Sequence, residues 1–393
     1  MKFIVGNQII KKTLDAVKNA VGSPIDNPVV GNILVQAEEA EGSITCTATN
    51  LNMTIRSTTQ DCRVDQSGAI LLEAGVLLPV IRALPDDDLL FEVKPDEFTA
   101  TLKCGKFKAK INGDDPSQFP PFQSVDKSEP HYDLRIPGST LKDVLSKLLI
   151  AVSRDNEISR YQTNGIQFEL NDGVWRGCST DGRRLSVYEA HEFEASVERS
   201  PQIIIAPAKT LRETLRSGLD GDDVQLTIGG RKMEIQSNGV AIVSNLLHGN
   251  FPEINRIIPK PGETLLRVDR AAFASAVHRV SVLSSRETKM VMLSVGKTDN
   301  QIILQCERDE TGGAATDSLE CEYSGPPFEI RLNHDYLLDF LQGSMSESVE
   351  LLCQPDDGIQ RKPIILRPIG NDEFRYILMP MRPPNDESSE GEK

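Results

Sequence analysis

An internal repeat with a period of one third of the chain is the feature that most constrains the fold of this sequence. The chain has 393 residues, and a third of 393 is 131. The Phe-Pro pair at Phe119 recurs 132 residues later at Phe251, and the Thr-Asn pair at Thr49 matches a Thr-Asp pair 131 residues later at Thr180. Three cysteines occupy comparable apolar–polar runs with spacings of 132 and 128, namely Cys46, Cys178 and Cys306. Because these separate spacings agree, the sequence predicts three similar units.

Each predicted unit contains the same order of elements twice: a short strand, a helix and further strands. The units open on strands at 1–5, 132–136 and 264–268, followed by helical patterns at 8–21, 139–153 and 270–284. A shorter helical pattern lies near the middle of each unit, at 75–84, 208–217 and 334–343. Alternating apolar and polar residues in the strand runs indicate antiparallel sheets with one covered face.

The sequence therefore predicts an α+β fold of three repeated domains, each with two helices packed on antiparallel sheets. We place these domains at residues 1–128, 131–256 and 262–382. Residues 383–393 form a Pro-led acidic tail that its composition predicts to be disordered.

Composition and local motifs argue against several classes of protein. The formal charge of −15 argues against a generic nucleic-acid binder, which normally carries a basic face. The N-terminus lacks a signal-peptide pattern, no run is long enough to span a bilayer, and the seven cysteines contain no CxxC pair. We therefore expect a cytoplasmic protein with reduced thiols. Five histidines without an HExxH motif give no support for a metal site, and no cofactor is expected.

The positive charge is concentrated on helices, since five of the six helical patterns are net positive. The exception is the last pattern, which carries Asp335 and Asp339. One explanation is that Lys and Arg favour helix surfaces in general. The other is a basic face that attracts a polyanion through its phosphates, independently of base sequence. The basic residues on or beside these helices are Lys11, Lys12, Lys18, Arg82, Lys142, Lys147, Arg154, Lys209, Arg212, Arg216, Arg270, Arg279, Arg286 and Lys289.

The stretch "CSTDGRRLSV" at 178–187 has a strong hairpin-turn signal, Asp181-Gly182, followed by two arginines. One interpretation is a tight turn with two solvated charges. Another is a phosphate-handling enzyme site, because Arg183 and Arg184 beside Asp181 would suit a phosphate. No Ser/His/Asp arrangement, P-loop or paired-carboxylate motif lies nearby, so we expect a protein without catalytic activity.

Six stretches together resemble the family of bacterial sliding clamps, the β subunits of DNA polymerase III. They are "MKF" at the start, "NPVVGNILV" at 27–35, "AVSRDNEISRYQTNG" at 151–165, "STDGRRLSV" at 179–187, "NFPEINRIIP" at 250–259 and "YILMPMR" at 376–382. The resemblance extends from Met1 to about Arg382. It implies a DNA sliding clamp, in which two chains close into a ring of six domains around duplex DNA, with helices inside and sheets outside. The ring tethers the replicative polymerase to its template and is not an enzyme.

The resemblance also implies a surface pocket that binds short linear peptides of the polymerase III α subunit, the clamp loader, other polymerases and repair proteins. Apolar residues and two methionines in this pocket suit a site that accepts several partners. Its arginines would bond the main chain or the acidic side chains of the peptide. The alternative for the last stretch is an ordinary terminal strand. The implied pocket residues are Thr163, Thr180, Gly182, Arg183, Arg184, Leu185, Pro252, Arg256, Ile257, Ile377, Leu378, Met379, Pro380, Met381 and Arg382.

The resemblance further implies which residues face DNA and which face the second copy of the chain. Phe107 and Ala109 would lie at one end of the homodimer interface, and Val282 and Leu283 at the other; the alternative is that all four are plain core residues. A chain that ends in exposed strand edges favours such pairing, and head-to-tail contact that closes after two copies gives a ring. The implied DNA-facing residues are Lys11, Lys12, Arg82, Lys142, Arg154, Tyr161, Lys209, Arg212, Arg216 and Arg279.

Three residues depart from the family's pattern. Thr163 stands where a leucine is common, which predicts a less apolar pocket floor. Pro24 stands where some members have an arginine that touches DNA, and Ala109 stands where a larger apolar residue is common. An interaction scaffold of the same fold that does not encircle DNA remains the alternative to a clamp.

Overall fold

The computed structural model of the chain divides into two compact units. Unit 1 holds residues 1–142, 193–200 and 209–246, and unit 2 holds 143–192, 201–208 and 247–393. Arg154, Arg382 and the predicted tail at 383–393 lie outside the residues that the structure describes. The described residues are 1–25, 27–94, 97–153, 161–171, 174–190, 194–197, 202–217, 223–258, 264–296, 300–308, 312–353, 359 and 362–381.

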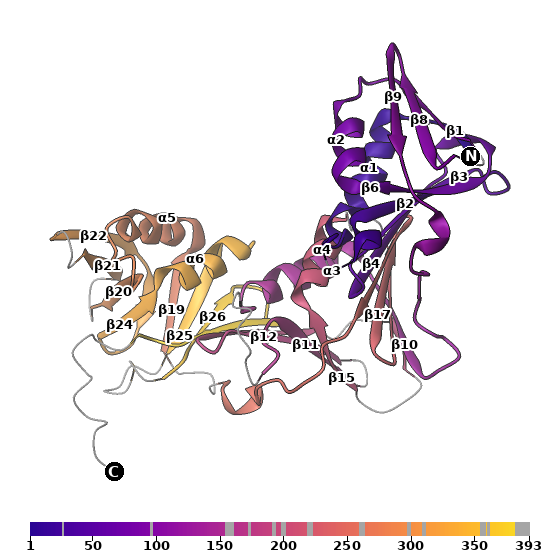
Figure 1. Cartoon of the computed structure of the whole chain (residues 1–393). Coiled ribbons are helices and arrows are strands. Elements are labelled where there is room, and N and C mark those ends of the chain that lie inside the picture. The colour runs from indigo at the N-terminus through magenta and orange to yellow at the C-terminus, as the bar shows by residue number, and fades with distance from the viewer. Residues whose placement is uncertain are drawn as a thin grey trace. The chain divides into compact units, whose positions relative to one another are not determined.

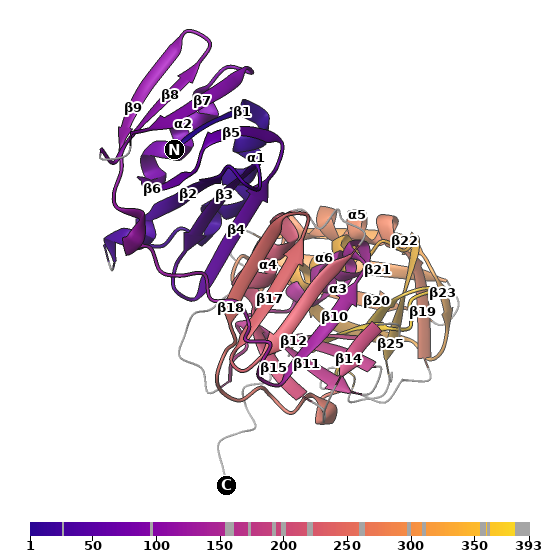
Figure 2. The ribbon, with the colours of Figure 1, turned by 90° about the vertical axis from the view of Figure 1, so that its right-hand side faces the viewer.

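Unit 1 contains two antiparallel sheets (Figure 1). Figure 2 shows the five-stranded sheet, whose order is β5–β1–β7–β8–β9. Its strands are β1 (Lys2–Gly6), β5 (Cys62–Gln66), β7 (Asp88–Val93), β8 (Thr99–Cys104) and β9 (Phe107–Asn112). The nine-stranded sheet has the order β14–β10–β16–β17–β18–β4–β3–β2–β6. Its strands are β2 (Asn32–Glu38), β3 (Ser43–Thr49), β4 (Met53–Thr59), β6 (Gly68–Glu73), β10 (His131–Ile136), β14 (Glu194–Val197), β16 (Val224–Gly229), β17 (Lys232–Ser237) and β18 (Val240–Asn245).

Unit 2 also contains two antiparallel sheets. The nine-stranded sheet has the order β15–β11–β12–β13–β27–β26–β25–β19–β23. Its strands are β11 (Gly165–Asn171), β12 (Val174–Thr180), β13 (Arg184–Ala190), β15 (Gln202–Pro207), β19 (Thr264–Asp269), β23 (Glu322–Ser324), β25 (Ser348–Cys353), β26 (Ile364–Pro368) and β27 (Phe374–Leu378). The four-stranded sheet has the order β22–β21–β20–β24, with strands β20 (Met290–Val295), β21 (Gln301–Arg308), β22 (Gly313–Glu320) and β24 (Phe328–Asn333).

The described residues form six α-helices, each coinciding with one of the six helical patterns of the sequence. They are α1 (Asn7–Val17), α2 (Ala74–Ala83), α3 (Gly138–Leu149), α4 (Ala208–Arg216), α5 (Arg270–Ser281) and α6 (His334–Gly343). All except α3 follow a strand without an intervening residue. Asp269 and Asn333 cap α5 and α6 by accepting hydrogen bonds from first-turn N–H groups, which have no partner within the helix. In unit 2, α5 and α6 lie side by side (Figure 1).

Each nine-stranded sheet draws its strands from two repeats. In unit 1, β18 of the second repeat pairs with β4 of the first, and Ile242 lies opposite Ile55. In unit 2, β13 of the second repeat pairs with β27 of the third, and Leu185 lies opposite Ile377. All four side chains are buried, so apolar contact as well as backbone hydrogen bonding holds neighbouring repeats together.

The cysteines mark the same position in each repeat and confirm the predicted threefold repetition. Cys46 lies in β3, Cys178 in β12 and Cys306 in β21, and each of these strands is the middle one of three consecutive antiparallel strands. All three thiols are buried. Of the seven cysteines, all of which the structure describes, only Cys62 on the edge strand β5 is partly exposed.

Candidate peptide-binding and nucleic-acid surfaces

The turn between β12 and β13 has its conformation fixed by its own side chains. Asp181 Oδ1 accepts hydrogen bonds from the backbone N–H groups of Arg183 (3.0 Å) and Arg184 (3.1 Å). Thr180 Oγ1 donates to the carbonyl oxygen of Arg184 at 2.7 Å and accepts from the N–H of Gly182 at 3.0 Å. Gly182 has φ +85°, a left-handed conformation that glycine adopts without steric cost. The Asp-Gly signal thus forms the predicted turn, and Arg183 is exposed on it.

Arg184 is enclosed, unlike its exposed neighbour Arg183. Only 3% of its side chain is exposed, with Nε 2.8 Å from Asp181 Oδ2 and Nη1 2.6 Å from Asp339 Oδ2. Nη1 also donates to Tyr376 Oη at 3.3 Å, and the Tyr336 ring covers the guanidinium at 4.2 Å. Burial alone would lower the pKa of Arg184, but Tyr376 and the two carboxylates raise it above its ordinary value, so the group stays charged.

Three stretches that the sequence assigns to one site meet in unit 2. Leu185 of β13 and Ile377 of β27 share a buried apolar cluster with Ile254, and Phe251 packs against this cluster. The N–H of Met379 donates to the carbonyl oxygen of Arg183 at 3.0 Å, which ties the end of β27 to the turn. Sequence analysis did not select Ile254 or Phe251, although both lie within the stretch that supplies Pro252 and Ile257.

The predicted peptide residues divide into buried supports and accessible groups. Thr180, Arg184, Leu185, Ile377 and Leu378 are buried. Arg256 is exposed and forms a surface ion pair with Glu253 at 2.9 Å; Thr163 and Pro252 are half-buried. The remaining described members are exposed or half-buried, and we call them the candidate peptide surface: Gly182, Arg183, Ile257, Met379, Pro380 and Met381.

The acidic residues of α6, the one described helix that is not net positive, both have cationic partners in the structure. Asp339 neutralises the buried Arg184, and Asp335 forms an ion pair with Lys289 at 2.7 Å. The two acids therefore have cationic partners, and α6 supplies Asp339 and Tyr336 to the surroundings of the turn. The unusual acidity of this helix was the only sequence signal for that contribution.

Most of the described cations assigned to DNA fall into two groups, those without an ion pair and those with an ion pair or backbone contact. Lys12, Lys142 and Lys209 are exposed, and none forms an ion pair with a residue that the structure describes. Lys11 donates a hydrogen bond to the carbonyl oxygen of Leu84 at 3.5 Å. Three arginines form ion pairs: Arg82 with Asp15 at 3.0 Å, Arg216 with Glu213 at 2.7 Å and Arg279 with Asp317 at 2.7 Å. Arg212 is half-buried, and Tyr161 is 37% exposed in a β-bridge to Asn250.

Lys147 corrects the expected charge pattern of α3. The sequence counts it among the basic residues of the helix surface, but only 6% of its side chain is exposed and Nζ lies 2.6 Å from Asp143 Oδ2. Its ammonium group also lies 5.4 Å from the centre of the Tyr188 ring. With its side chain buried against Asp143 and Tyr188, Lys147 belongs to the interior of unit 2.

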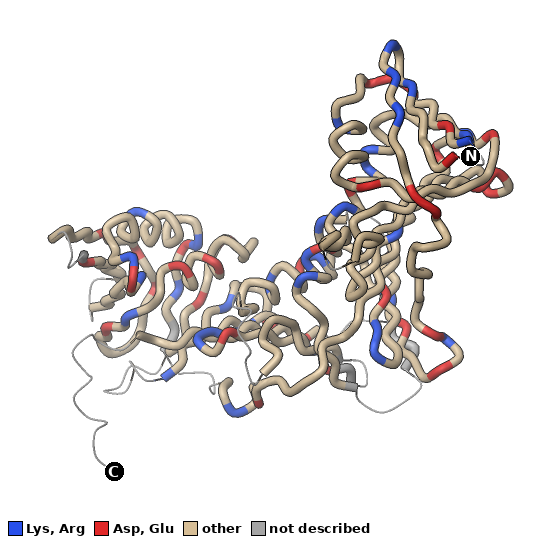
Figure 3. The backbone as a smooth tube through the Cα atoms, viewed as in Figure 1, with Lys and Arg blue, Asp and Glu red and all other residues tan. Residues whose placement is uncertain are grey.

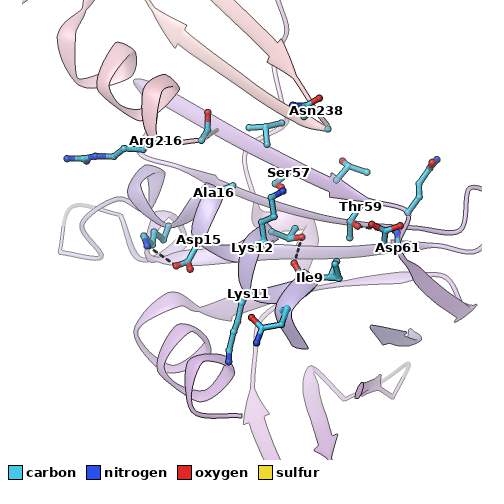
Figure 4. Close-up of a pocket in the computed structure, with 18 of the residues that line it drawn as sticks. Ile9, Lys11, Lys12, Asp15, Ala16, Ser57, Thr59, Asp61, Arg216 and Asn238 are labelled. Atoms are coloured by element: carbon cyan, nitrogen blue, oxygen red, sulfur yellow. Dashed lines mark hydrogen bonds and ion pairs between the residues drawn. The ribbon is translucent and has the colours of Figure 1, made fainter. Parts of the chain in front are cut away.

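Unit 1 contains an open pocket of 1360 Å³ beside α1 (Figure 4). Residues of α1, of the 57–61 segment, of the end of α4 and of the hairpin at 238–240 line it. Lys11 and Lys12 extend from α1 in opposite directions. Burial opposes ionisation of Asp15, but hydrogen bonds from Lys18 and Arg82 hold its pKa below the ordinary value. The lining has four basic side chains, Lys11, Lys12, Lys18 and Arg216, against two acids, Asp15 and Asp61, and therefore suits an anion such as phosphate.

The residues assigned to the homodimer lie at or near two strand edges. Strand β9 ends one sheet of unit 1, and Phe107 on this strand is 42% exposed. Strand β22 ends one sheet of unit 2 and packs against α5. Val282, the residue that follows α5, is 68% exposed. Ala109 and Leu283 are half-buried. None of the four is fully buried, which argues against the core alternative. Basic residues occur along the β8–β9 hairpin of unit 1 (Figure 3).

Other kinds of site find no support in the described part of the chain. It holds no group of three or more His, Cys, Asp or Glu side chains suited to a metal ion. None of its helices is long and apolar enough to cross a membrane.

Known proteins match the chain along almost its whole length. Family models of the DNA polymerase III beta subunit match the N-terminal domain at residues 1–123, the central domain at 135–253 and the C-terminal domain at 255–382. The Beta sliding clamp of Synechocystis sp. is 29% identical over 402 residues, covering 97% of this chain and 99% of the relative. The Beta sliding clamp of Caulobacter vibrioides is 28% identical over 389 residues, covering 97% and 100%.

Solved structures agree with these matches. The beta sliding clamp of C. crescentus has a TM-score of 0.84 at 27% identity, and the alignment covers 98% of this chain and 99% of that one. The DNA polymerase sliding clamp of Bacillus subtilis has a TM-score of 0.86 at 21% identity, with the same coverage, and supports the fold. Three consecutive domain matches and the repeated α+β architecture lead to one conclusion: this chain belongs to the family of bacterial DNA polymerase III beta subunits, the beta sliding clamps.

Proposed function

We propose that this chain is a non-catalytic processivity subunit of a DNA polymerase III holoenzyme. Two copies close into a ring around duplex DNA, slide along it and hold the replicative polymerase on its template. The polymerase α subunit, the clamp loader, other polymerases and repair proteins dock through short peptides at the candidate peptide surface. Because its ligand is the bacterial chromosome, the protein works in the cytoplasm.

The observation that carries the ring is that β9 ends a sheet of unit 1 and β22 ends a sheet of unit 2. A free edge presents a row of unpaired N–H and C=O groups, which pair readily with another chain. β9 carries Lys108 and Lys110, whereas β22 carries Asp317 and Glu320. Opposite charges favour pairing of β9 in one copy with β22 in the other, and two such contacts complete a closed dimer.

The chemistry of the helices supports duplex DNA as the encircled ligand. The accessible cations Lys12, Lys142 and Lys209 lie on three different helices, and no cluster of them is suited to reading base edges. Scattered lysines contact phosphates, so binding is independent of sequence and sensitive to salt. A ring held by topology needs no stronger contact, and weak phosphate contacts allow it to slide.

The candidate peptide surface combines the groups that a peptide site needs. Ile257, Met379 and Met381 offer accessible apolar area, and methionine adapts to ligands of different shape. Arg183 offers an exposed cation for an acidic side chain or a carbonyl group. Gly182 leaves open space above the backbone, since a Cβ atom there would meet nothing within 4 Å.

Retention on DNA of two topologies tests the proposed ring. The purified protein is loaded by its clamp loader onto nicked circular DNA, and half of the sample is then linearised. We expect the protein to stay on circles through a salt wash and to leave linear DNA through the ends. Equal loss from both forms would identify a scaffold that binds DNA without encircling it, and the ring would be rejected.

A further inference from the structure

We propose that Arg184 is a positioning residue whose buried guanidinium holds the turn at 181–183 against α6 and so fixes one wall of the candidate peptide surface. The inference rests on the proposed docking of peptides at that surface. It replaces the direct ligand contact that the sequence motif predicts for Arg184 with an action through its neighbours.

The guanidinium joins three elements that are far apart in the sequence. It reaches Asp181 in the turn at 2.8 Å, Asp339 in α6 at 2.6 Å and the hydroxyl of Tyr376 in β27 at 3.3 Å. Tyr376 Oη in turn donates to the carbonyl oxygen of Tyr336 at 3.1 Å, which makes a second link between β27 and α6. With only 3% of the Arg184 side chain exposed, no part of the guanidinium is left for a peptide.

This network controls the accessible residues next to it. Arg184 lies opposite Leu378 in the antiparallel pairing of β13 with β27. Arg183 directly precedes Arg184 in the chain, and Met379 directly follows Leu378. Those two are themselves joined by the hydrogen bond from Met379 N–H to Arg183 O at 3.0 Å. The positions of Arg183 and Met379 on the candidate peptide surface therefore depend on where the guanidinium anchors the start of β13.

The charges explain why an arginine is required. One guanidinium lies between two carboxylates, whose side chains are 15% (Asp181) and 29% (Asp339) exposed. Without the cation, the two carboxylates lose their shared partner and repel each other in a poorly solvated place. Lysine would keep the charge, but its single ammonium group cannot bridge Asp181, Asp339 and Tyr376 in the way a planar guanidinium does. In both cases the turn moves away from α6.

The first test measures binding of the polymerase III α subunit of the same organism to full-length variants by surface plasmon resonance, together with their melting temperatures. We expect Arg184→Met to weaken binding about tenfold or more. Arg184→Lys should recover only part of that loss. A residue that merely stabilises the fold would lower the melting temperature of the variant and leave the affinity of the folded protein unchanged.

A double variant separates positioning from contact. Arg183→Ala removes an accessible cation, and we expect it to weaken binding in an otherwise unchanged protein. In Arg183→Ala/Arg184→Met the combined loss should be smaller than the product of the two single losses, because a displaced turn no longer presents Arg183 to the ligand. Fully multiplicative losses would show that Arg184 acts independently, and would overturn the inference.

Two variants of α6 test the other end of the network. Asp339→Asn removes the charge that anchors Arg184 and should weaken binding severalfold. Asp335→Asn is the matched control, since Asp335 lies on the same helix but pairs with the exposed Lys289, and it should leave the affinity unchanged. If Arg184→Met does not fold, wild-type affinity of Asp339→Asn overturns the inference.

Ile257→Ala distinguishes failure of the inference from failure of the proposed function. If Ile257→Ala weakens binding whereas Arg184→Met binds like the wild type, only the positioning role is wrong. If Ile257→Ala and Arg183→Ala also bind like the wild type, the peptide surface itself is wrong, and the inference falls with it.

Discussion

Arg183 and Arg184 are chemically identical neighbours in opposite surroundings. The first is exposed on a turn, and the second is enclosed by two carboxylates, a tyrosine hydroxyl and an aromatic ring. Their difference is set by Asp181 and Gly182, which fix the turn and point the second side chain inward. At this scale, the chemistry of a residue type matters less than the backbone that orients it.

Ile257 offers a direct test of the candidate peptide surface. We expect Ile257→Ala to weaken binding of the polymerase α subunit about tenfold, since truncating a well-packed apolar contact in an interface costs more than about 1 kcal/mol. Ile303→Ala is the matched control: Ile303 is 41% exposed, Ile257 is 40% exposed, and Ile303 lies on β21. Equal effects of the two variants on affinity would contradict the surface.

The helices show which properties of an element can be read from a sequence. Their existence and positions were predicted correctly because each has an amphipathic pattern, and most begin directly after a strand. The ion-pair partners of their charged side chains could not be predicted in the same way. Arg184 and Asp339 are 155 residues apart, and Arg279 and Asp317 are 38 apart. Pairs of this kind exist only after the chain has folded, so charge counts on isolated helices overestimate the free positive charge.

Helix α1 gives a prediction for DNA binding. Lys12 is exposed beside the open pocket of unit 1, so Lys12→Glu should weaken binding to a short duplex in low salt. It should also reduce the slope of log affinity against log salt by about one, the value for a lost phosphate contact. Lys94→Glu changes the net charge equally on a side chain that is 75% exposed and paired with Glu97. If both variants lose the same affinity for DNA, the loss comes from net charge alone, and Lys12 on α1 does not contact a phosphate.

The ion pair between α5 and β22 gives a prediction for acid stability. The hydrogen bond from Arg279 holds the pKa of Asp317 below its ordinary 3.8, so the pair stabilises the folded state above that pH and is lost as the pH falls through the lowered value. At pH 6 we expect Asp317→Asn to cost up to about 1 kcal/mol of unfolding free energy, as for a surface pair with one exposed and one partly exposed partner. Urea titrations should show this difference from the wild type disappearing as the pH falls below 3.8 and through the lowered pKa of Asp317. If the difference in unfolding free energy persists in acid, it comes from an interaction other than the Arg279–Asp317 ion pair.

At the scale of the whole molecule, the repeats were predictable and their joints were not. Matching spacings in the sequence revealed three units, because duplicated segments keep similar residues in corresponding strands. Nothing in those spacings shows that β18 pairs with β4 or that β13 pairs with β27. Strand pairing between repeats depends on three-dimensional register, and so does the identity of the strands that end each sheet, β9 and β22 among them.

A charge swap between the edges tests ring closure. In one variant, Lys108→Glu/Lys110→Glu makes β9 acidic like β22; in the other, Thr316→Lys/Glu320→Lys makes β22 basic like β9. Each variant alone should sediment as a monomer, because like charges then oppose each other at both contacts of the ring. The equimolar mixture should sediment as a dimer, since each altered edge then meets one of opposite charge. The Arg279–Asp317 pair remains intact in both variants.

If both single variants remain dimers, or if the mixture stays monomeric while both variants are folded, the chains do not associate through β9 and β22. Raising the ionic strength offers an independent check. It should weaken the wild-type dimer, because the opposed charges lie on exposed strands and are screened by salt.

The burial of six thiols has a practical consequence for experiments on this protein. Cys62 on β5 is the single partly exposed cysteine, and burial still raises its pKa, so thiolate forms there only in alkaline solution. A methanethiosulfonate nitroxide, which reacts with thiols and not with the amines that are also deprotonated in base, should therefore attach to one sulfur atom per chain. The native protein thus carries its own labelling handle, and a closed pair of chains would hold two probes at a fixed spacing without any engineered cysteine.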